Sequence, residues 1–299
     1  MVPMTSILVA TDFSDGARYA AERAAFVAQE QSAHLSLIHV MSRSALSDLR
    51  KLFFAPPDVE TTLIDDAKHT LNAIADGLSR QTGVMRSTAV KTGHAQAEIL
   101  SATESADLLV LGAHGESSLP DLMLGTTAER VLSACTRPVL VVKSPPKTRY
   151  QHVLVPVDFS PYSASALAMA SRIAPLAHMT ILHVFRIPFE GRLQIVGASE
   201  TGIRRYCEEE QQSAEQQMFE LIRESHLDSN RVSYRVERGD PSPMILATAE
   251  ELLSDLIVIG KHGQSWFEDL FLGSVTHHIL ARSKCDTLVV HKEPAKRSS

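Results

Sequence analysis

The chain has 299 residues, of which 44% are hydrophobic and 21% carry a charge. This composition is typical of a folded protein and excludes a chain that is disordered throughout. The formal net charge of -6 at pH 7 argues against broad, salt-dependent binding to nucleic acid, which needs a positively charged surface.

The first half alternates short aliphatic runs with longer amphipathic segments, as in βα units that build a parallel sheet covered by helices on both faces. The aliphatic runs predict strands over residues 7–10, 35–40, 87–91, 108–111 and 139–142. The segments between them predict helices over residues 17–31, 59–80, 96–104 and 127–134.

The second half repeats this order after the segment 143–147, in which two prolines interrupt any strand or helix. We interpret that segment as a linker, and we expect the polar tail 292–299 to fray. The strands expected beyond the linker cover residues 153–157, 180–184, 233–237, 256–259 and 287–290. We therefore predict two domains, 1–145 and 150–299, each with five strands and four helices.

One glycine pattern occurs at equivalent places in the two halves. The pattern G-x2-G-x9-G-[ST] begins at Gly112 in the first half and at Gly260 in the second. Near the start of each half, the run ILVATDFS matches VLVPVDFS, so that Asp12 corresponds to Asp158. A repeat of about 145 residues is much longer than the roughly 20–50 residues of a solenoid repeat. The repeat therefore indicates a duplicated domain.

Each glycine pattern begins where the fourth strand ends and finishes where a helix starts. Ligands of open parallel sheets bind beyond the carboxyl ends of the strands, and glycines there let the main chain approach a ligand closely. Thr126 and Ser274 would open the fourth helix, whose free amides and dipole favour an anion. The pattern indicates a phosphate cradle. The alternative is that the glycines only form turns and the hydroxyls only cap a helix.

Asp12 and Asp158 follow the first strand of each half. Such a carboxylate can accept hydrogen bonds from ribose hydroxyls or an adenine edge, or hold magnesium through water; alternatively, it caps the first helix. Val40 and Val184 close the second strand and could form an apolar wall for a base. The preceding histidines, His39 and His183, are expected to be core residues and not ligands.

Several other kinds of site are not indicated by the sequence. The three cysteines are too scattered for a disulfide framework or a metal knuckle, and no histidine has a ligand partner at suitable spacing. We therefore predict no metal site. Because no apolar run is long enough to cross a bilayer and no signal-like segment opens the chain, we expect a cytoplasmic protein without membrane contact.

These motifs resemble the universal stress protein family in its tandem two-domain form. The ATP-binding members carry G-2x-G-9x-G-[ST] and an aspartate after the first strand, and both features occur twice here. The resemblance covers nearly the whole chain. It implies two flavodoxin-like, Rossmann-like α/β domains with strand order 3-2-1-4-5, and a nucleotide across the switch point between strands one and four.

The resemblance also implies a ligand and a set of site residues. The ligand is ATP, with or without magnesium. The aspartate and the residue that closes strand two would hold adenosine, and the glycines and the following hydroxyl would hold phosphates. The implied contacts are Asp12, Val40, Gly112, Gly115, Gly125, Thr126 and Thr127 in the first half, and Pro156, Asp158, Val184, Gly260, Gly263, Gly273, Ser274 and Val275 in the second.

In the family, two domains often pair through their fifth strands, here 138–142 and 286–290. The resemblance therefore implies an intramolecular pseudo-dimer, with a homodimer as a further option.

The nine-residue gap of each motif departs from the family pattern. The gaps contain no lysine or arginine, and they carry Glu116, Asp121, Glu268 and Asp269. A missing charged hydrogen bond to phosphate is worth about 1.5–3 kcal/mol, or one to two powers of ten in affinity. The second site is closer to the family pattern, because it keeps Pro156 before the aspartate and has a serine after the last glycine. We expect the second domain to bind nucleotide better than the first.

Three functions are consistent with the sequence. The leading hypothesis is a nucleotide-binding stress regulator or sensor that does not consume ATP, because no P-loop lysine and no nucleophile–base pair is visible. The second is an enzyme that hydrolyses ATP slowly or phosphorylates itself at Thr126 or Ser274, with an aspartate supporting magnesium. The third is an interaction module without nucleotide, for which the apolar segment 53–57 is a candidate exposed patch or lid; alternatively, that segment anchors the core. Trp266 and Phe267 could cover a ligand, dock a partner or pack in the core.

Overall fold

The computed structural model describes residues 3–43, 59–115, 124–187, 200–263 and 272–291. The chain divides into two compact units, Met1–Arg149 with Lys284–Leu288 and Tyr150–Ser283 with Val289–Ser299. In the described part, each half contains five strands and four α-helices.

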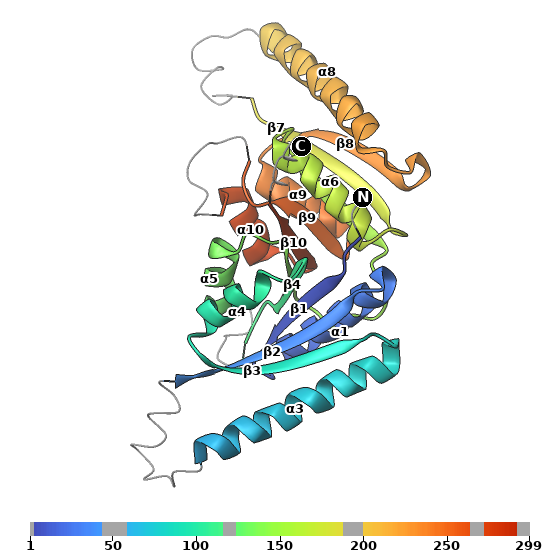
Figure 1. Ribbon diagram of the computed structural model, residues 1–299. Coiled ribbons are helices and arrows are strands. Elements are labelled where there is room, and N and C mark those ends of the chain that lie inside the picture. Colours follow the sequence, from blue (N-terminus) through green and yellow to red (C-terminus); the bar gives the residue numbers. More distant parts are fainter. Residues whose placement is uncertain (1–2, 44–58, 116–123, 188–199, 264–271, 292–299) are drawn as a thin grey trace, which may run out of the picture. The chain divides into compact units, whose positions relative to one another are not determined.

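The first half forms a parallel sheet with the strand order β3-β2-β1-β4-β5. Helices α1 and α3 lie on one side of this sheet, and α4 and α5 lie on the other (Figure 1). The strands are β1 (Ser6–Thr11), β2 (His34–Ser42), β3 (Arg86–Gly93), β4 (Leu108–Gly112) and β5 (Val139–Val142). The helices are α1 (Asp15–Gln31), α3 (Val59–Thr82), α4 (Ala95–Thr103) and α5 (Thr126–Ala134).

The second half repeats the arrangement, with the strand order β8-β7-β6-β9-β10. The pairs β6–β7, β6–β9 and β7–β8 are parallel. The strands are β6 (His152–Val157), β7 (His178–Phe185), β8 (Val232–Arg238), β9 (Leu256–Gly260) and β10 (Asp286–Val290). The helices are α6 (Pro161–Ile173), α8 (Glu200–Ser225), α9 (Pro241–Glu251) and α10 (Ser274–Arg282), with a short 3-10 turn at Ser229–Arg231. The flavodoxin-like order implied by the family resemblance is therefore confirmed.

The central strands are buried because they consist almost entirely of aliphatic residues. In β4 and β9, four consecutive residues are buried on both faces, which fits strands covered by helices on each side. Helix α1 begins where the Ser14 hydroxyl accepts the Ala17 amide at 3.2 Å, and it ends at Ser32 in the left-handed region. Its buried face carries mainly alanines, so it packs closely on the sheet.

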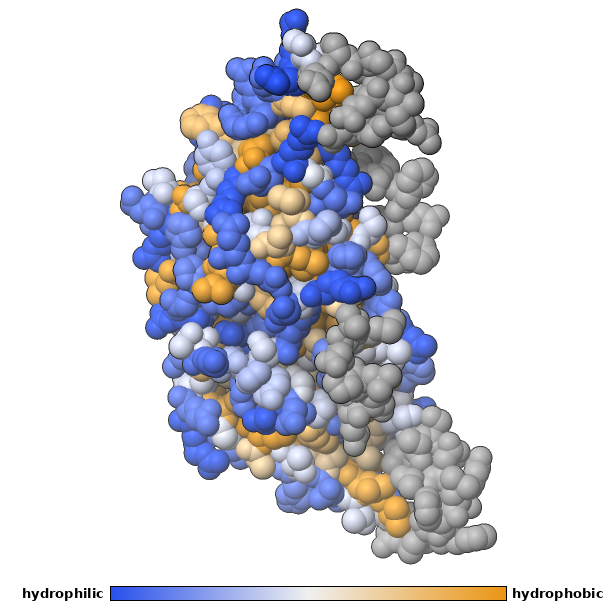
Figure 2. Space-filling view, turned by 180° about the vertical axis from the view of Figure 1, so that it is seen from behind, coloured by the Kyte–Doolittle hydropathy of each residue, from blue (hydrophilic) through white to orange (hydrophobic). Residues whose placement is uncertain are grey.

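Polar residues cover most of the face shown in Figure 2, and hydrophobic residues lie between them in smaller patches. Among the described residues, the exposed large hydrophobic side chains are spread along the sequence: Met85, Leu176, Tyr206, Phe219, Tyr234 and Leu253. Exposed apolar side chains of this scattered kind are normal on a folded protein.

Candidate functional site

Each half has a cavity at the carboxyl ends of its central strands. The first has a volume of about 360 Å³ and lies beside β1, β2 and β4, next to the N-termini of α4 and α5. The second has a volume of about 270 Å³ and occupies the equivalent place beside β6, β7, β9, α9 and α10. The structure brings every predicted site residue to these linings. They are Asp12, Val40, Gly112, Gly115, Gly125, Thr126 and Thr127 around the first cavity, and Pro156, Asp158, Val184, Gly260, Gly263, Gly273, Ser274 and Val275 around the second.

The linings of the two cavities correspond in sequence position, but the side chains are not identical. Bulkier side chains at several positions reduce the space in the second cavity. The pairs that differ in this way are Ala10 and Pro156, Ala17 and Ser163, Ala95 and Pro241, and Ala128 and Thr276.

The second glycine of each motif packs directly against the carboxylate of the first strand. A Cβ atom placed on Gly115 would lie 2.5 Å from Asp12 Oδ2, and one on Gly263 would lie 2.6 Å from Asp158 Oδ2. Both distances are far below a normal contact, so any other residue would displace the carboxylate. The glycine therefore makes room for the aspartate, a role that is not apparent from the motif alone.

The other carboxylate oxygen is fixed by the start of the first helix. Asp12 Oδ1 accepts hydrogen bonds from the amide of Ser14 at 3.1 Å and from its hydroxyl at 2.5 Å. Asp158 Oδ1 accepts from the Ser160 amide at 3.0 Å and from the Ser163 hydroxyl at 3.1 Å. The N-cap residues are the serines and not the aspartates, so each carboxylate is held in place beside the cavity.

Next to each aspartate, a phenylalanine ring packs against a histidine ring. Phe13 has φ 67° and Phe159 has φ 61°, values in the left-handed region that side chains larger than glycine rarely adopt. Their rings lie against the imidazoles of His39 and His183, with centroids 4.2 and 4.3 Å apart. These ring contacts support the turn that carries the aspartate.

Both histidines also bond the strand that ends at the aspartate. Nδ1 of His39 lies 2.8 Å from the Thr11 carbonyl, and Nδ1 of His183 lies 2.9 Å from the Val157 carbonyl. Burial lowers the pKa of His183, while the carbonyl and the charge of Asp158 oppose that shift. A neutral imidazole with the proton on Nδ1 donates to this carbonyl. Neither imidazole lines either of these two cavities, so both act as packing residues here.

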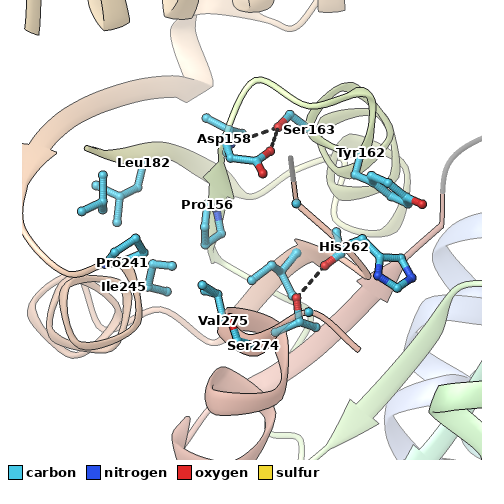
Figure 3. A pocket seen from close by; sticks show the side chains of 17 residues that line it. Pro156, Asp158, Tyr162, Ser163, Leu182, Pro241, Ile245, His262, Ser274 and Val275 are labelled. Carbon is cyan, nitrogen blue, oxygen red and sulfur yellow. Dashed lines mark hydrogen bonds between the residues drawn. The ribbon is translucent and has the colours of Figure 1, made fainter. Parts of the chain in front are cut away.

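The walls of the second cavity divide into an apolar side and a polar side (Figure 3). Leu182, Pro241 and Ile245 lie on one side, and the Asp158 carboxylate points in from another. In the first cavity, Ile38, Ala95 and Ile99 occupy the apolar positions. The contribution of α4 and α9 to these walls was not predicted from the sequence. The only available signal was that each helix begins at the carboxyl edge of the sheet, with small or apolar residues four apart.

The last glycine of each motif caps a helix without using a side chain. Gly125 precedes α5 and Gly273 precedes α10, and neither helix start has a side-chain cap. The amide of Gly125 donates to the Ala113 carbonyl at 2.9 Å, and that of Gly273 donates to the Lys261 carbonyl at 2.9 Å. Thr126 and Ser274 are the first helical residues, so the alternative in which their hydroxyls cap the helix is not what the structure shows. The amides of this first turn have no partner within the helix, as at every helix start.

The second cavity also contains an aromatic contact that the first lacks. The Tyr162 ring lies edge-on to the His262 imidazole, with centroids 5.6 Å apart, and both residues line the cavity (Figure 3). Gly16 takes the place of Tyr162 in the first half, and its main chain packs against Gly112. The repeat aligns Tyr162 with Gly16, but the sequence does not show that the tyrosine ring turns into the cavity.

Charged residues are scarce around both cavities. Among the described lining residues, the aspartates are the only acidic side chains, and there is no lysine or arginine. Lys261 lies inside the second motif, but its side chain is 4% exposed and does not line the cavity. The predicted gap residues Glu116, Asp121, Glu268 and Asp269 lie outside the described residues, as do segment 53–57, Trp266, Phe267 and the tail 292–299.

Neither a metal site of three or more ligands nor a membrane-spanning helix is found among the described residues. No group of three or more histidine, cysteine, aspartate or glutamate side chains converges as a metal site there. No helix in the same part of the chain combines the length and the apolar character needed to cross a membrane.

Comparisons with known proteins cover both halves. Residues 4–143 and 149–291 each match the model of the universal stress protein family. A universal stress protein of Mycolicibacterium smegmatis is 25% identical over 296 residues, which is 95% of this chain and 96% of that protein. Universal stress protein YxiE of Bacillus subtilis is 30% identical over 144 residues, covering 46% of this chain and 97% of YxiE.

A solved structure has the same fold over the full length. The crystal structure of a universal stress protein from Archaeoglobus fulgidus matches with a TM-score of 0.70 and 21% identity, covering 96% of this chain and 98% of that chain. Both full-length matches therefore extend over the two halves of this chain.

Proposed function

This chain belongs to the universal stress protein family, and from that premise we propose that it binds an adenine nucleotide as a sensed ligand in the cytoplasm. Its place in the stress response follows from the family, whereas the ligand and the site are the proposal. The supporting observation is the pairing, in both halves, of a fixed carboxylate with a helix start that has no side-chain cap.

The chemistry of each lining matches a different part of a nucleotide. The apolar side, with Leu182 and Ile245 in the second half, suits the flat face of a base. The Asp158 carboxylate accepts hydrogen bonds from ribose hydroxyls, since its Oδ1 is fixed by Ser160 and Ser163. The first turn of α10 offers main-chain amides and a favourable dipole to phosphate oxygens. ATP therefore fits the residues that are present.

The cavity linings could hold magnesium only together with the phosphates of a nucleotide. Each lining supplies a single carboxylate, and magnesium in nucleotide sites is usually held by one or two carboxylates, waters and the phosphates themselves. We therefore propose that any magnesium arrives with ATP and contacts the aspartate through water.

We propose that the second cavity binds more tightly than the first. Pro156 and Pro241 replace two alanines and restrict the walls, and the cavity is smaller, at about 270 Å³ against about 360 Å³. A wall that is already in its bound shape loses less entropy when the ligand enters.

Catalysis is the weaker proposal. The described linings contain no lysine or arginine to stabilise charge on a transferred phosphoryl group. The comparison proteins carry the family name and no enzyme name. Phosphorylation at Thr126 or Ser274 remains as an alternative, and incubation with labelled ATP followed by mass spectrometry tests it.

The pairing of the domains is also a proposal. By the family resemblance, the fifth strands, 138–142 and 286–290, would join the two domains of one chain as a pseudo-dimer. Light scattering distinguishes this arrangement from a homodimer, because a chain that pairs its own domains has the mass of a monomer.

Thermal unfolding with and without nucleotide tests the proposed function. We expect magnesium-ATP, ADP or AMP to raise the melting temperature, and 100 times the dissociation constant corresponds to about 2.7 kcal/mol of added stability. Gly273→Val should remove most of the shift, because it places a branched side chain where the main chain must meet phosphate, and Gly125→Val should remove little. If no nucleotide shifts the wild-type protein, the proposal is wrong and the interaction module becomes the better hypothesis.

A further inference from the structure

The second half contains another cavity, at the opposite ends of its strands, and two histidine side chains line it. Its volume is about 500 Å³, and it lies beside the first residues of β6 and β7, the first half of β8 and the end of α9. We propose that this cavity binds a divalent transition-metal ion through the imidazoles of His152 and His178, with water completing the coordination. The proposal is independent of nucleotide binding.

The register of the sheet places the two histidines side by side. His152 on β6 is the direct partner of His178 on β7 in a parallel pair. Neighbouring strands lie about 4.7–4.9 Å apart, and side chains at paired positions leave the sheet on the same face. Two imidazoles at that spacing can converge on one ion at the usual distance of about 2.0–2.1 Å. Both side chains are exposed, so an ion can reach them.

A hydrogen bond orients His178 in the manner of a metal ligand. Its Nε2 lies 3.0 Å from the Ser233 hydroxyl oxygen, which in turn lies 3.1 Å from the Thr180 hydroxyl oxygen. When Nε2 carries the proton and donates to Ser233, Nδ1 keeps its lone pair for a metal. Metal-bound histidines usually make an outer hydrogen bond of this kind, which fixes both the tautomer and the ring.

The charge around the cavity favours a cation. Helix α9 ends at Glu251, and the last carbonyls of a helix carry partial negative charge. Glu251 and Arg235 form a two-bond ion pair, with distances of 3.0 and 2.9 Å, and so largely neutralise each other. The Asp255 carboxylate accepts the main-chain amides of Gln151 and His152 at 2.7 and 3.1 Å, so it lies next to the main chain of His152.

The site has only two protein ligands within the described part of the chain, since no third metal-binding side chain converges there. Imidazole ligands suit copper, nickel and zinc ions. Two imidazoles with water give an exchangeable site, in contrast to the closed four-ligand sites that hold structural zinc.

The first half provides an internal control. Nε2 of His34 lies 3.0 Å from the Ser87 hydroxyl oxygen, as in the His178 pair, and Ser36 continues the chain of hydroxyls at 2.9 Å. The direct partner of His34 on the neighbouring strand is Ser6, where the second half has His152. The first half therefore has the oriented histidine without a second imidazole.

Titration of the untagged full-length chain with copper(II) or nickel(II) tests the site. By calorimetry without nucleotide, we expect one exchangeable ion per chain, and the copper electron paramagnetic resonance spectrum should show two nitrogen donors. His152→Asn and His178→Asn should each weaken binding more than tenfold and leave one nitrogen donor. His34→Asn should change nothing, and Ser233→Ala should weaken binding by about tenfold.

A gain-of-site variant provides the reverse test. Ser6→His places a second imidazole beside His34 and should add a second bound ion per chain. Three results would overturn the proposal: no ion bound by the wild-type chain, binding unchanged in both His152→Asn and His178→Asn, or an equal loss in His34→Asn. Nucleotide-induced melting shifts should be the same in all of these variants, which separates this site from the proposed nucleotide site.

Discussion

The two cavities share one polar arrangement and differ in their walls. In both, the aspartate packs against the second glycine of the motif, and a phenylalanine ring lies against a histidine ring beside the turn, stacked in the first half and tilted in the second. The walls differ because Pro156, Pro241 and Tyr162 replace two alanines and a glycine of the first half. The duplicated domains have therefore kept the carboxylate and the helix start that we propose as contacts for a sugar and phosphates, and they have diverged in the cavity walls.

A second contrast lies at the residue that follows the fifth strand. Lys143 holds this position in the first half and His291 holds it in the second, and burial lowers the pKa of both. The pKa of Lys143 falls to about 8, where Asp286 and Cys285 oppose the shift. The pKa of His291 falls to about 4, because the charges of Lys261 and His262 act in the same direction as burial. Equivalent positions therefore respond to different pH ranges.

The largest expected effect is a loss of stability of the second half at acidic pH. The pKa of His291 falls from 6.5 to about 4 on folding, so the unfolded chain binds a proton first as the pH drops. The stability contributed by the neutral imidazole is complete above pH 6.5 and is lost as the pH falls towards 4, by on the order of 3 kcal/mol. Urea unfolding between pH 4 and 7 should show this loss, and His291→Asn should reduce it.

Hydrogen exchange assigns the acid effect to one half. The Lys143 pKa of about 8 lies below its usual 10.5, so the corresponding change in the first half falls between pH 10.5 and 8. At pH 5, amides of the second half should therefore lose protection before those of the first. Equal loss in both halves would contradict the contrast between Lys143 and His291.

The next largest effect concerns the aspartate–glycine contact. Gly263→Ala should displace the Asp158 carboxylate, because the new Cβ would lie 2.6 Å from Oδ2. Loss of one charged hydrogen bond corresponds to about 1.5–3 kcal/mol, or a ten- to hundredfold weaker nucleotide affinity by calorimetry. Gly115→Ala should have a smaller effect on total binding if the second cavity dominates.

Gly77→Ala is the matched control for this pair of variants. Gly77 lies in α3, and a Cβ there would have no neighbour within 4 Å. The same chemical change should therefore leave nucleotide affinity unaltered. If Gly263→Ala binds nucleotide as well as Gly77→Ala does, the aspartate does not contact the ligand.

A smaller effect on stability is expected from a hydrogen bond that ties the last helix of the second half to β9. The Thr276 hydroxyl donates to the Gly260 carbonyl at 2.7 Å, whereas the first half has Ala128 at that position. Thr276→Ala should lower the free energy of unfolding by about 1 kcal/mol, because it leaves a carbonyl without its partner. Urea unfolding of Thr276→Ala checks this, and Thr70→Ala, the same change at an exposed position of α3, serves as the matched control. A stability equal to wild type would mean that water replaces the hydroxyl.

The smallest effect would make the first cavity resemble the second. Ala95→Pro copies Pro241 at the first residue of α4, and the preceding His94 already has the extended φ of -88° and ψ of 118° that proline requires. We expect stability to rise by about 0.4–1 kcal/mol, because proline restricts the unfolded chain. Calorimetry should also show tighter nucleotide binding in a Gly273→Val background. Unchanged affinity there would remove wall shape as the explanation of the contrast.

Much of the fold could be predicted because the strands are aliphatic runs in a regular order. Every predicted strand is present, although β2 extends to Ser42 and β3 to Gly93, beyond their expected ends. These ends are harder to predict because main-chain pairing with a neighbour continues past the hydrophobic run. Register Ser42↔Gly93 illustrates this, since neither residue is apolar.

The candidate site was predictable where a motif or the end of a strand fixed the position of its residues. The glycines and aspartates come together as expected, because their spacing relative to the strands is fixed by the fold. The wall residue Ile245 and the brace formed by Phe159 and His183 were missed, since they depend on which face of a helix or which turn conformation meets the cavity. His152 and His178 are far apart in sequence, and only strand register pairs them.

Because each aspartate touches the second glycine of its motif, these two positions should change together in evolution, although they are far apart in the sequence. Any side chain in place of Gly115 or Gly263 pushes on the carboxylate, and a domain that has lost its aspartate no longer needs the glycine. After a gene duplication, a copy released from ligand binding should therefore lose both residues in either order. Both pairs are intact in this chain, so the two positions together offer a test for degenerate copies among tandem relatives.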